Sequence, residues 1–387
     1  MNVVNRKFSI PYLSYFLVIL GFNVWSSTFH VYVIKEHNLS DFEVSLLFSL
    51  TSVPGLLAMF AVPLYRYINP RVVLASLCAL TAVALLIISN AGIWWLLIPG
   101  VLAICCGQAF SYTFNSALCL SLVDDRDAAQ NALAKMRSFG PLAALCATAS
   151  ILLFEQSLGY KAIVGVVAVV VLIFSLYLFF ARIDFPLNRE KVRLKIKNSL
   201  WPYYALNALS GARSALFKTF VITLLIREHD FDMARTSGLI LASTIAGFIG
   251  YRALAWLSDR VDPKYILGFV HTTVGFLFIG FATVPSSEVL VVLFLFDSMI
   301  FGVAAVTDST LRRFVAKDKI VGQLSTGMSL FYVMGIVAPI VGGAIASFYS
   351  LDVVFLFAAA VAWTAAVVSQ IYCARASRYR EQGLLVD

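Results

Sequence analysis

Two charged residues of opposite sign lie inside long apolar stretches of this 387-residue chain. Arg213 falls within the apolar segment 201–226, and Asp297 falls within the segment 288–311. At the helical rise per residue, they lie roughly 18 Å and roughly 14 Å from the nearer ends of the two segments. Burying single ions is costly, and a carboxyl group beside a guanidinium can gain or lose a proton when its surroundings change. We therefore predict that Arg213 and Asp297 form a proton-handling pair; a static structural salt bridge is the alternative.

Polar side chains recur at helical spacing in two other apolar segments. Residues at relative positions 0, 3, 4 and 7 share one face of a helix. Such a face can bind a polar solute or hydrogen-bond to a neighbouring helix, and we predict solute contacts for the whole set. The two stripes are Asn23, Ser26, Ser27 and His30 in segment 11–34, and Gln108, Ser111, Tyr112 and Asn115 in segment 93–120.

Three residues of the apolar segments offer further contacts. Lys218 lies far along segment 201–226, and its long side chain can reach toward water and meet an anion. Tyr332 lies near the middle of segment 322–348 and offers a ring on which a solute can stack. His30 is predicted to contact the solute; an interfacial side chain without a proton-carrying role is its alternative.

The composition excludes most soluble classes of protein. Hydrophobic residues make up 60% of the chain, charged residues 13%, and the mean hydropathy is +0.88. A soluble chain is nearer half apolar and a quarter charged, so a cytosolic enzyme, a disordered regulator and a secreted disulfide scaffold are excluded. An integral membrane protein in a lipid bilayer remains.

Twelve segments are long and apolar enough to span a membrane, which takes about 20 residues each. We therefore predict an all-α membrane protein with twelve transmembrane helices. The segments are roughly 11–34, 43–65, 71–90, 93–120, 131–154, 160–181, 201–226, 236–257, 264–284, 288–311, 322–348 and 351–374.

The positions of the basic residues predict the orientation. With the N-terminus inside, 22 of the 29 Lys and Arg residues fall in inner loops and ends, four fall outside and three lie within spans. Basic residues accumulate on the cytoplasmic side, so both termini are predicted to be cytoplasmic. The same rule explains the net charge of +8 without a nucleic-acid partner. The compact loops indicate a bacterial inner membrane, and the basic start without a cleavage site indicates a retained first helix.

The two halves of the sequence resemble each other. Residues 35–37, Lys-Glu-His, recur as Arg-Glu-His at 227–229, which is 192 residues later. A duplicated six-span unit is typical of transporters. We expect an N-terminal six-helix bundle over 1–181, a basic cytoplasmic linker over 182–200 and a C-terminal bundle over 201–387.

These features resemble the major facilitator superfamily over essentially the whole chain. The family's loop motif after spans two and eight runs Gly-x-Leu-x-Asp-Arg-x-Gly-Arg-Lys. Residues 255–264 keep its Leu, Asp, Arg and Lys but neither glycine, and the first half keeps only the arginine. In the family this loop holds the cytoplasmic side closed by charge contacts. The resemblance therefore implies an inner gate at Arg66, Asp259, Arg260 and Lys264.

The resemblance also implies a fold and an activity. The fold is two pseudo-symmetric six-helix bundles whose spans one, four, seven and ten line a central cavity. The activity is secondary active transport of a small organic solute by alternating access. From the buried charges themselves we predict the Arg213–Asp297 pair as its proton-coupling site. A partial Gly-Pro-x-x-Gly-Gly element at Gly140 and Pro141, a run seen in many antiporters of the family, favours export by antiport; plain helix packing is its alternative. The cations Arg213 and Lys218 against the single Asp297 favour an anionic or zwitterionic solute.

Other functions stay open at this point. The protein could be an uncoupled facilitator, a proton symporter for an organic anion, or, in another class, a non-transporting membrane sensor or structural protein. The sequence contains no P-loop, no Gly-rich dinucleotide turn and no nucleophile elbow, so an enzyme is not expected. The six cysteines form no CxxC pair and lie far from histidines, so we expect no disulfide, metal or cofactor. We expect a monomer.

Overall fold

The computed structural model describes residues 3–61, 68–121, 126–180, 197–258, 260–311, 315 and 320–381. Ten helices in this part of the chain are long and apolar enough to cross a membrane. They coincide with ten of the twelve predicted spans. The other two spans, 43–65 and 288–311, are each divided into two shorter helices. Residues 182–196 of the predicted linker lie outside the described part.

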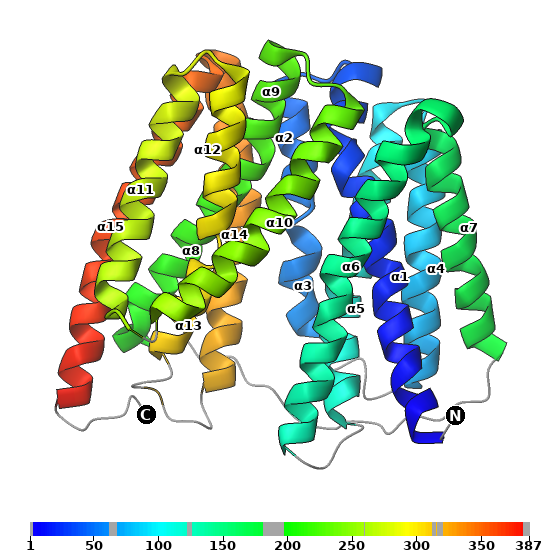
Figure 1. Cartoon of the computed structure of the whole chain (residues 1–387), viewed down its shortest axis with the longest axis horizontal. Coiled ribbons are helices and arrows are strands. Elements are labelled where there is room, and N and C mark those ends of the chain that lie inside the picture. Colours follow the sequence, from blue (N-terminus) through cyan, green and yellow to red (C-terminus); the bar gives the residue numbers. More distant parts are fainter. Residues whose placement is uncertain are drawn as a thin grey trace. The chain divides into compact units, whose positions relative to one another are not determined.

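The chain folds into two compact units. The first comprises Met1–Asn38, Val53–Lys191 and Asp232–Leu241. Its α4 runs beside α7, and α1 packs on α5 and α6 (Figure 1), with an apolar core drawn from α1, α4, α5 and α7. Its elements are α1 (Val3–Val31), η1 (Tyr32–Glu36), α3 (Val53–Ala61), α4 (Pro70–Asn90), η3 (Trp94–Leu96), α5 (Leu97–Ser121), α6 (Arg126–Leu158), α7 (Tyr160–Phe180) and the start of α10 (Met233–Ser258).

The second unit comprises Leu39–Ser52, Val192–Phe231 and Ala242–Asp387. In this unit α11 runs beside α15 (Figure 1), and α14 packs against both α8 and α2. Its elements are α2 (Asp41–Leu50), η4 (Asn198–Leu200), α8 (Trp201–Leu216), η5 (Phe217–Val221), α9 (Ile222–His229), the remainder of α10, α11 (Pro263–Thr283), α12 (Ser287–Ile300), α13 (Val303–Leu311), α14 (Ile320–Phe348) and α15 (Leu351–Glu381).

The first interruption separates α2 from α3. The amides of Thr51 and Ser52 bond to carbonyls three residues back, which is the tightened turn of a helix end. Pro54 lies two residues after Ser52, in the first turn of α3, and proline has no N–H to donate and clashes with the turn before it. The predicted span therefore consists of two short helices.

The second interruption, at Phe301 and Gly302, separates α12 from α13 where α10 comes very close. A Cβ at Gly250 of α10 would clash with the Met299 backbone. A Cβ at Gly302 would lie 2.8 Å from the ring of Tyr251. The absence of a side chain at both glycines permits this approach.

Local structure repeats in the two halves as the sequence does. Asn69 and Asp262 cap α4 and α11, two 21-residue helices that each begin with proline. Each cap accepts a hydrogen bond from the backbone amide two residues later. Asn38 and Asp230 both adopt left-handed backbone, with φ of 55° and 50°, a conformation that Asn and Asp tolerate. Corresponding positions of the repeat therefore have the same conformation.

Candidate functional site

Arg213 and Asp297 form a buried ion pair within the second unit. Arg213 lies in the last turn of α8, and Asp297 lies in the last turn of α12, just before its interruption. Arg213 Nη2 donates to Asp297 Oδ1 at 2.5 Å, and the side chains are 5% and 1% exposed. The predicted contact between the two side chains is confirmed.

The pair leaves hydrogen-bonding capacity unused. Among the described residues, Arg213 Nε and Asp297 Oδ2 are buried without a hydrogen-bond partner. A buried polar atom left in this way costs about 1–3 kcal/mol, so it calls for an explanation. Chemically, the carboxylate can take a proton at Oδ2, and the guanidinium can donate from Nε to a second acceptor.

The ring of Phe301, at the interruption after α12, lies near two cations. The Arg213 guanidinium carbon is 5.4 Å from the ring centroid, and the Lys218 ammonium nitrogen is 5.5 Å from it. Aromatic faces attract cations. Lys218 belongs to η5, a π-helical segment of a kind often found at functional sites. Lys218 is exposed in the structure, whereas Arg213 is buried and bonded to Asp297.

The polar stripe of α1 bonds to its own helix. Asn23 Nδ2 donates to the Ile19 carbonyl at 2.8 Å, and Ser27 Oγ donates to the Asn23 carbonyl at 2.6 Å. Asn23 is half-buried, while Ser27 and His30 are buried. These bonds fix the side chains in place and leave acceptor lone pairs on their oxygens.

The second stripe lies on α5, which packs against α1 in the first unit. Gln108 is half-buried, Tyr112 is exposed and Asn115 is buried. Asn115 Nδ2 donates to the backbone and hydroxyl oxygens of Ser111, both at 2.9 Å. The ring of Tyr112 lies 6.3 Å from that of Tyr15 on α1. The two stripes therefore lie on neighbouring helices.

Tyr332 of α14 lies close in sequence to the contact between α14 and α8. A Cβ at Gly211 would clash with the Phe331 carbonyl oxygen, so the two backbones touch two residues from Arg213. The half-buried Tyr332 ring is edge-on to the Phe331 ring at 5.7 Å. Tyr332 and Arg213 thus sit on two closely packed helices.

The predicted inner gate is described only in part, because Arg66 and Asp259 lie outside the described residues. Arg260 is held by the end of α10. Its guanidinium carbon is 4.1 Å from the Trp256 ring centroid, and its Nη1 donates to the Trp256 carbonyl at 3.0 Å. Lys264 has an exposed side chain in the first turn of α11.

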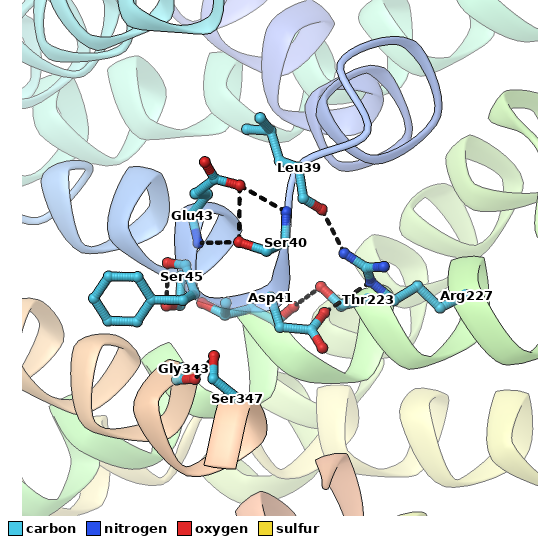
Figure 2. A network of polar contacts seen from close by, with 11 residues as sticks. Leu39, Ser40, Asp41, Glu43, Ser45, Thr223, Arg227, Gly343 and Ser347 are labelled. Atoms are coloured by element: carbon cyan, nitrogen blue, oxygen red, sulfur yellow. Dashed lines mark hydrogen bonds and ion pairs between the residues drawn. The ribbon is translucent and has the colours of Figure 1, made fainter. Parts of the chain in front are cut away.

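A polar network that the sequence analysis does not single out joins α2 to α9 (Figure 2). Arg227 of α9 approaches Asp41 with 2.7 Å between Nε and Oδ1, and its Nη2 donates to the Leu39 carbonyl at 2.5 Å. Ser40 and Glu43 form a reciprocal capping box at the start of α2. The box fixes the first turn of the helix and with it the position of Asp41.

The same helix α2 packs very closely on α14. A Cβ at Gly343 would clash with Ser45 Oγ, and one at Gly335 would lie 2.6 Å from Ser52 Oγ. Small residues let two helix backbones approach without interlocking side chains. The two helix backbones therefore approach each other closely at these glycines.

The sequence analysis does not single out His271 either. This residue is buried in α11, and its Nδ1 has no hydrogen-bond partner among the described residues. The signal that points to it is a histidine in the middle of an apolar span, where an ionisable group is rare.

The sequence matches the family model of the Major Facilitator Superfamily over residues 12–335. The chain belongs to the major facilitator superfamily. It is an all-α, multi-pass membrane protein, and it is a transporter rather than an enzyme. The subfamily is not defined by this match. A search of curated proteins by sequence gave no significant match.

Solved structures of superfamily transporters share the fold. A mutant of the nucleoside transporter NupG has a TM-score of 0.77 at 14% identity, covering 95% of this chain and 99% of that chain. A bacterial homologue of the human lysosomal transporter Spinster, inward-facing and unoccupied, has a TM-score of 0.74 at 13% identity, covering 99% of this chain and 98% of that chain. At such identities the likeness concerns the fold alone.

Proposed function

We propose that this superfamily member is a secondary active transporter that moves a small organic solute by alternating access and is coupled to protons. The observation that carries the proposal is the buried Arg213–Asp297 pair. Ionisable residues at membrane depth are costly and mark solute pathways and proton relays. Replacing a buried ion pair by apolar residues is often neutral or stabilising, so the fold alone gives no reason to keep it.

The coupling step uses the balance between two effects on Asp297. The guanidinium of Arg213 favours the ionised carboxylate, whereas burial favours the neutral acid. An anionic solute that competes for Arg213 weakens the first effect and promotes proton uptake. Opening the site to water on one side weakens the effect of burial. The affinity of Asp297 for a proton then differs between the conformational states of the transporter. This difference, rather than the ion pair itself, couples the proton to the solute.

Solute contacts are proposed in both units. In the first unit the candidates are Asn23, Ser27, His30, Gln108, Tyr112 and Asn115 on the neighbouring helices α1 and α5. In the second unit they are Arg213, Lys218 and Tyr332. The exposed ammonium of Lys218 beside the buried pair supports an anionic or zwitterionic solute. Nucleosides belong in the test panel because NupG is a nucleoside transporter of the same fold.

Direction and gating complete the proposal. Gly140 of α6 lies against the Tyr15 hydroxyl, where a Cβ would be 3.3 Å away, so the Gly-Pro element lies at a close helix contact. Export by antiport is proposed on this element. The inner gate is assigned to Arg66, Asp259, Arg260 and Lys264. The Asp41–Arg227 pair is assigned to an outer gate, because α2 is held there by charge and by a small-residue contact.

The proposed setting follows the distribution of charge. A monomer in a bacterial inner membrane would carry both termini in the cytoplasm. The bundles of residues 1–181 and 201–387 would move around the solute, with the basic segment 182–200 joining them on the cytoplasmic side.

Ligand binding by the purified full-length protein tests the proposal first. A thermal-shift panel would contain organic carboxylates, amino acids, nucleosides and organic cations. A ligand at a hundred times its Kd stabilises the folded state by about 2.7 kcal/mol, so a bound compound raises the melting temperature. Lys218→Gln removes the exposed cation and keeps the buried pair, and we expect it to lose the stabilisation given by anions.

Transport in liposomes then tests coupling, with the compound that gives the largest shift. Accumulation that requires an imposed pH gradient supports the proposal. An equal rate after a protonophore collapses the gradient would instead identify an uncoupled facilitator. Absence of binding by every class in the panel would contradict transport of a small organic solute and favour a sensor.

A further inference from the structure

One face of α12 meets α8 and η5 through three successive side chains. Phe294, Asp297 and Phe301 lie at relative positions 0, 3 and 7, so they share one side of the helix. The Phe294 ring stacks on the Phe217 ring of η5, with 4.9 Å between the ring centroids. Asp297 accepts the hydrogen bond from Arg213 of α8. Phe301, which forms the C-terminal cap of α12, therefore lies at the end of a continuous contact with these two segments.

Helix α10 holds the backbone on both sides of Phe301. Gly250 of α10 lies against the backbone of Met299, and Tyr251 packs on Gly302. Neither glycine has room for a side chain, so the backbone cannot move at these points without breaking the contacts. The backbone that carries the Phe301 ring is thus fixed from α10, independently of the charged residues around the ring.

The two cations beside Phe301 differ in their partners. Arg213 is bonded to Asp297, and its guanidinium carbon lies 5.4 Å from the Phe301 ring centroid. The Lys218 nitrogen lies 5.5 Å from the same centroid, and within the described part of the chain Lys218 makes no hydrogen bond or ion pair. Both distances are within the limit of about 6 Å for attraction between a cation and an aromatic face. The ring is therefore the contact that the structure gives to the Lys218 ammonium.

An aromatic ring holds a cation without neutralising it. A carboxylate partner would compensate the charge of Lys218, and an incoming anion would have to displace that partner. The Phe301 ring carries no net charge, so the ammonium keeps its positive charge and its donors. A lysine side chain also loses rotamer freedom when it binds a ligand, and a side chain that is already restrained loses less. Both effects favour the binding of an anion by Lys218.

We propose that Phe301 is a positioning residue of the solute site, whose ring holds the Lys218 ammonium in place for a carboxylate group of the solute. The carboxylate takes the ammonium from the ring when the solute binds. This inference rests on the proposed contact between Lys218 and an anionic or zwitterionic solute. It adds the residue that makes the site prefer a carboxylate over a neutral compound of the same shape.

Nuclear magnetic resonance of the purified full-length protein tests this role, with isotope-labelled methyl groups on the lysines as the probe. Reductive methylation keeps the positive charge of each lysine, and Lys218→Arg identifies the Lys218 signal by its loss. Protons above an aromatic ring are shifted upfield, so we expect the methyl signal of Lys218 to lie upfield of the signals of the other lysines. In Phe301→Leu, which keeps an apolar side chain without a ring, this displacement should disappear.

Benzoate and succinate, compared with benzamide and succinamide, then report the preference for an anion. We expect the two carboxylates to move the Lys218 signal and the two amides to leave it in place. Loss of the restraint on one lysine should raise the Kd for the carboxylates by about three- to tenfold in Phe301→Leu. Phe301→Trp keeps an aromatic face, so it should keep the upfield signal and the affinity of the wild type.

The outcomes separate this role from the proposed function. A Lys218 signal that neither carboxylate moves overturns the proposed anion contact at Lys218, and with it the role of Phe301. Carboxylate affinities that are equal in Phe301→Leu and the wild type overturn the role of Phe301 alone. The matched control is Phe296→Leu, which removes an exposed ring of α12 outside the shared face and should leave the signal and the affinities unchanged.

A measurement on the wild type keeps the test independent of the folding of Phe301→Leu. Without an added anion, a Lys218 methyl signal at the position of the exposed lysines would show that the ring does not hold the ammonium, and the proposal would be wrong. An upfield signal that moves toward that position as benzoate is added supports transfer of the ammonium from the ring to the carboxylate.

Discussion

Asp41 of α2 and Arg227 of α9 are 186 residues apart in the sequence and form an ion pair of 2.7 Å. The pair binds a helix from the first half of the sequence into the second unit. Conversely, the segment Asp232–Leu241 from the second half of the sequence belongs to the first unit. The two exchanged segments, Leu39–Ser52 and Asp232–Leu241, begin 193 residues apart. The exchange therefore follows the internal repeat. If the proposed outer gate opens during transport, we expect α2 to separate from α9 and α14.

Neutralising one partner should favour this release. Asp41 and Arg227 are 23% and 32% exposed, and an ion pair this close to solvent contributes up to about 1 kcal/mol. Asp41→Asn should therefore raise the released population by up to about fivefold. We would introduce Ser45→Cys, at the buried contact with α14, and measure its labelling by a maleimide added from outside.

The control for this prediction lies in the same turn of α2. Glu43→Gln keeps a side chain able to complete the capping box and leaves the Asp41–Arg227 pair intact. Its labelling rate should match that of the parent. Equal labelling of the Asp41→Asn and parent proteins would show that the pair does not restrain α2.

The close contact between α8 and α14 leads to a second prediction. A Cβ at Gly211 would clash with the Phe331 carbonyl oxygen between α8 and α14. Gly211→Ala should therefore destabilise the second unit by about 1–3 kcal/mol, as overpacking usually does. Gly238→Ala on α10 is the control, because no atom lies within 4 Å of its added methyl group. Thermal unfolding in detergent should show a lower melting temperature for the first variant alone.

We expect the free energy of unfolding to depend on pH through His37, which lies just beyond η1. Burial lowers the pKa of His37 below its ordinary value of 6.5, and Lys161 acts in the same direction while Glu36 opposes it. Well above pH 6.5 the histidine is neutral in both folded and unfolded chains and contributes nothing. Below it, the unfolded chain binds a proton that the folded chain resists, so stability falls as the pH falls.

Replacing His37 should remove this component. Melting temperatures of the parent should fall between about pH 7 and pH 5, and those of His37→Gln should fall less. His229→Gln controls for the loss of a histidine elsewhere at a helix end. Identical pH profiles for His37→Gln and the parent would remove His37 as a source of the effect.

The sequence predicts the spans well because apolar length is a local property. It also predicts the Arg213–Asp297 contact, since charges inside apolar segments are rare and need partners. The interruption before α3 has a local signal in Pro54. The interruption at Phe301 and Gly302 has a weaker sequence signal. It coincides with the close approach of α10, which is a tertiary contact that the local sequence does not show.

The missed features are non-local in the same sense. Asp41 and Arg227 sit at helix ends, where single charges are normally solvated, and only the fold brings them together. The burial of His271 in α11 likewise depends on the packing of neighbouring helices. The inner-gate residues Arg66 and Asp259 stay a prediction of the loop motif, because they lie outside the described part of the chain.

The last prediction concerns the buried pair itself. Asp297→Asn keeps the shape of the side chain and a hydrogen bond to Arg213 but cannot exchange a proton. It should abolish accumulation or extrusion driven by a pH gradient and spare exchange of solute for solute, measured in liposomes with the compound of largest thermal shift. Arg213→Ala should impair both activities, because it removes a solute contact and leaves Asp297 buried and unpaired, a change that typically costs about 3–5 kcal/mol. Melting curves of both proteins separate lost coupling from lost folding. Gradient-driven transport at the full rate in Asp297→Asn would move the coupling site away from this pair.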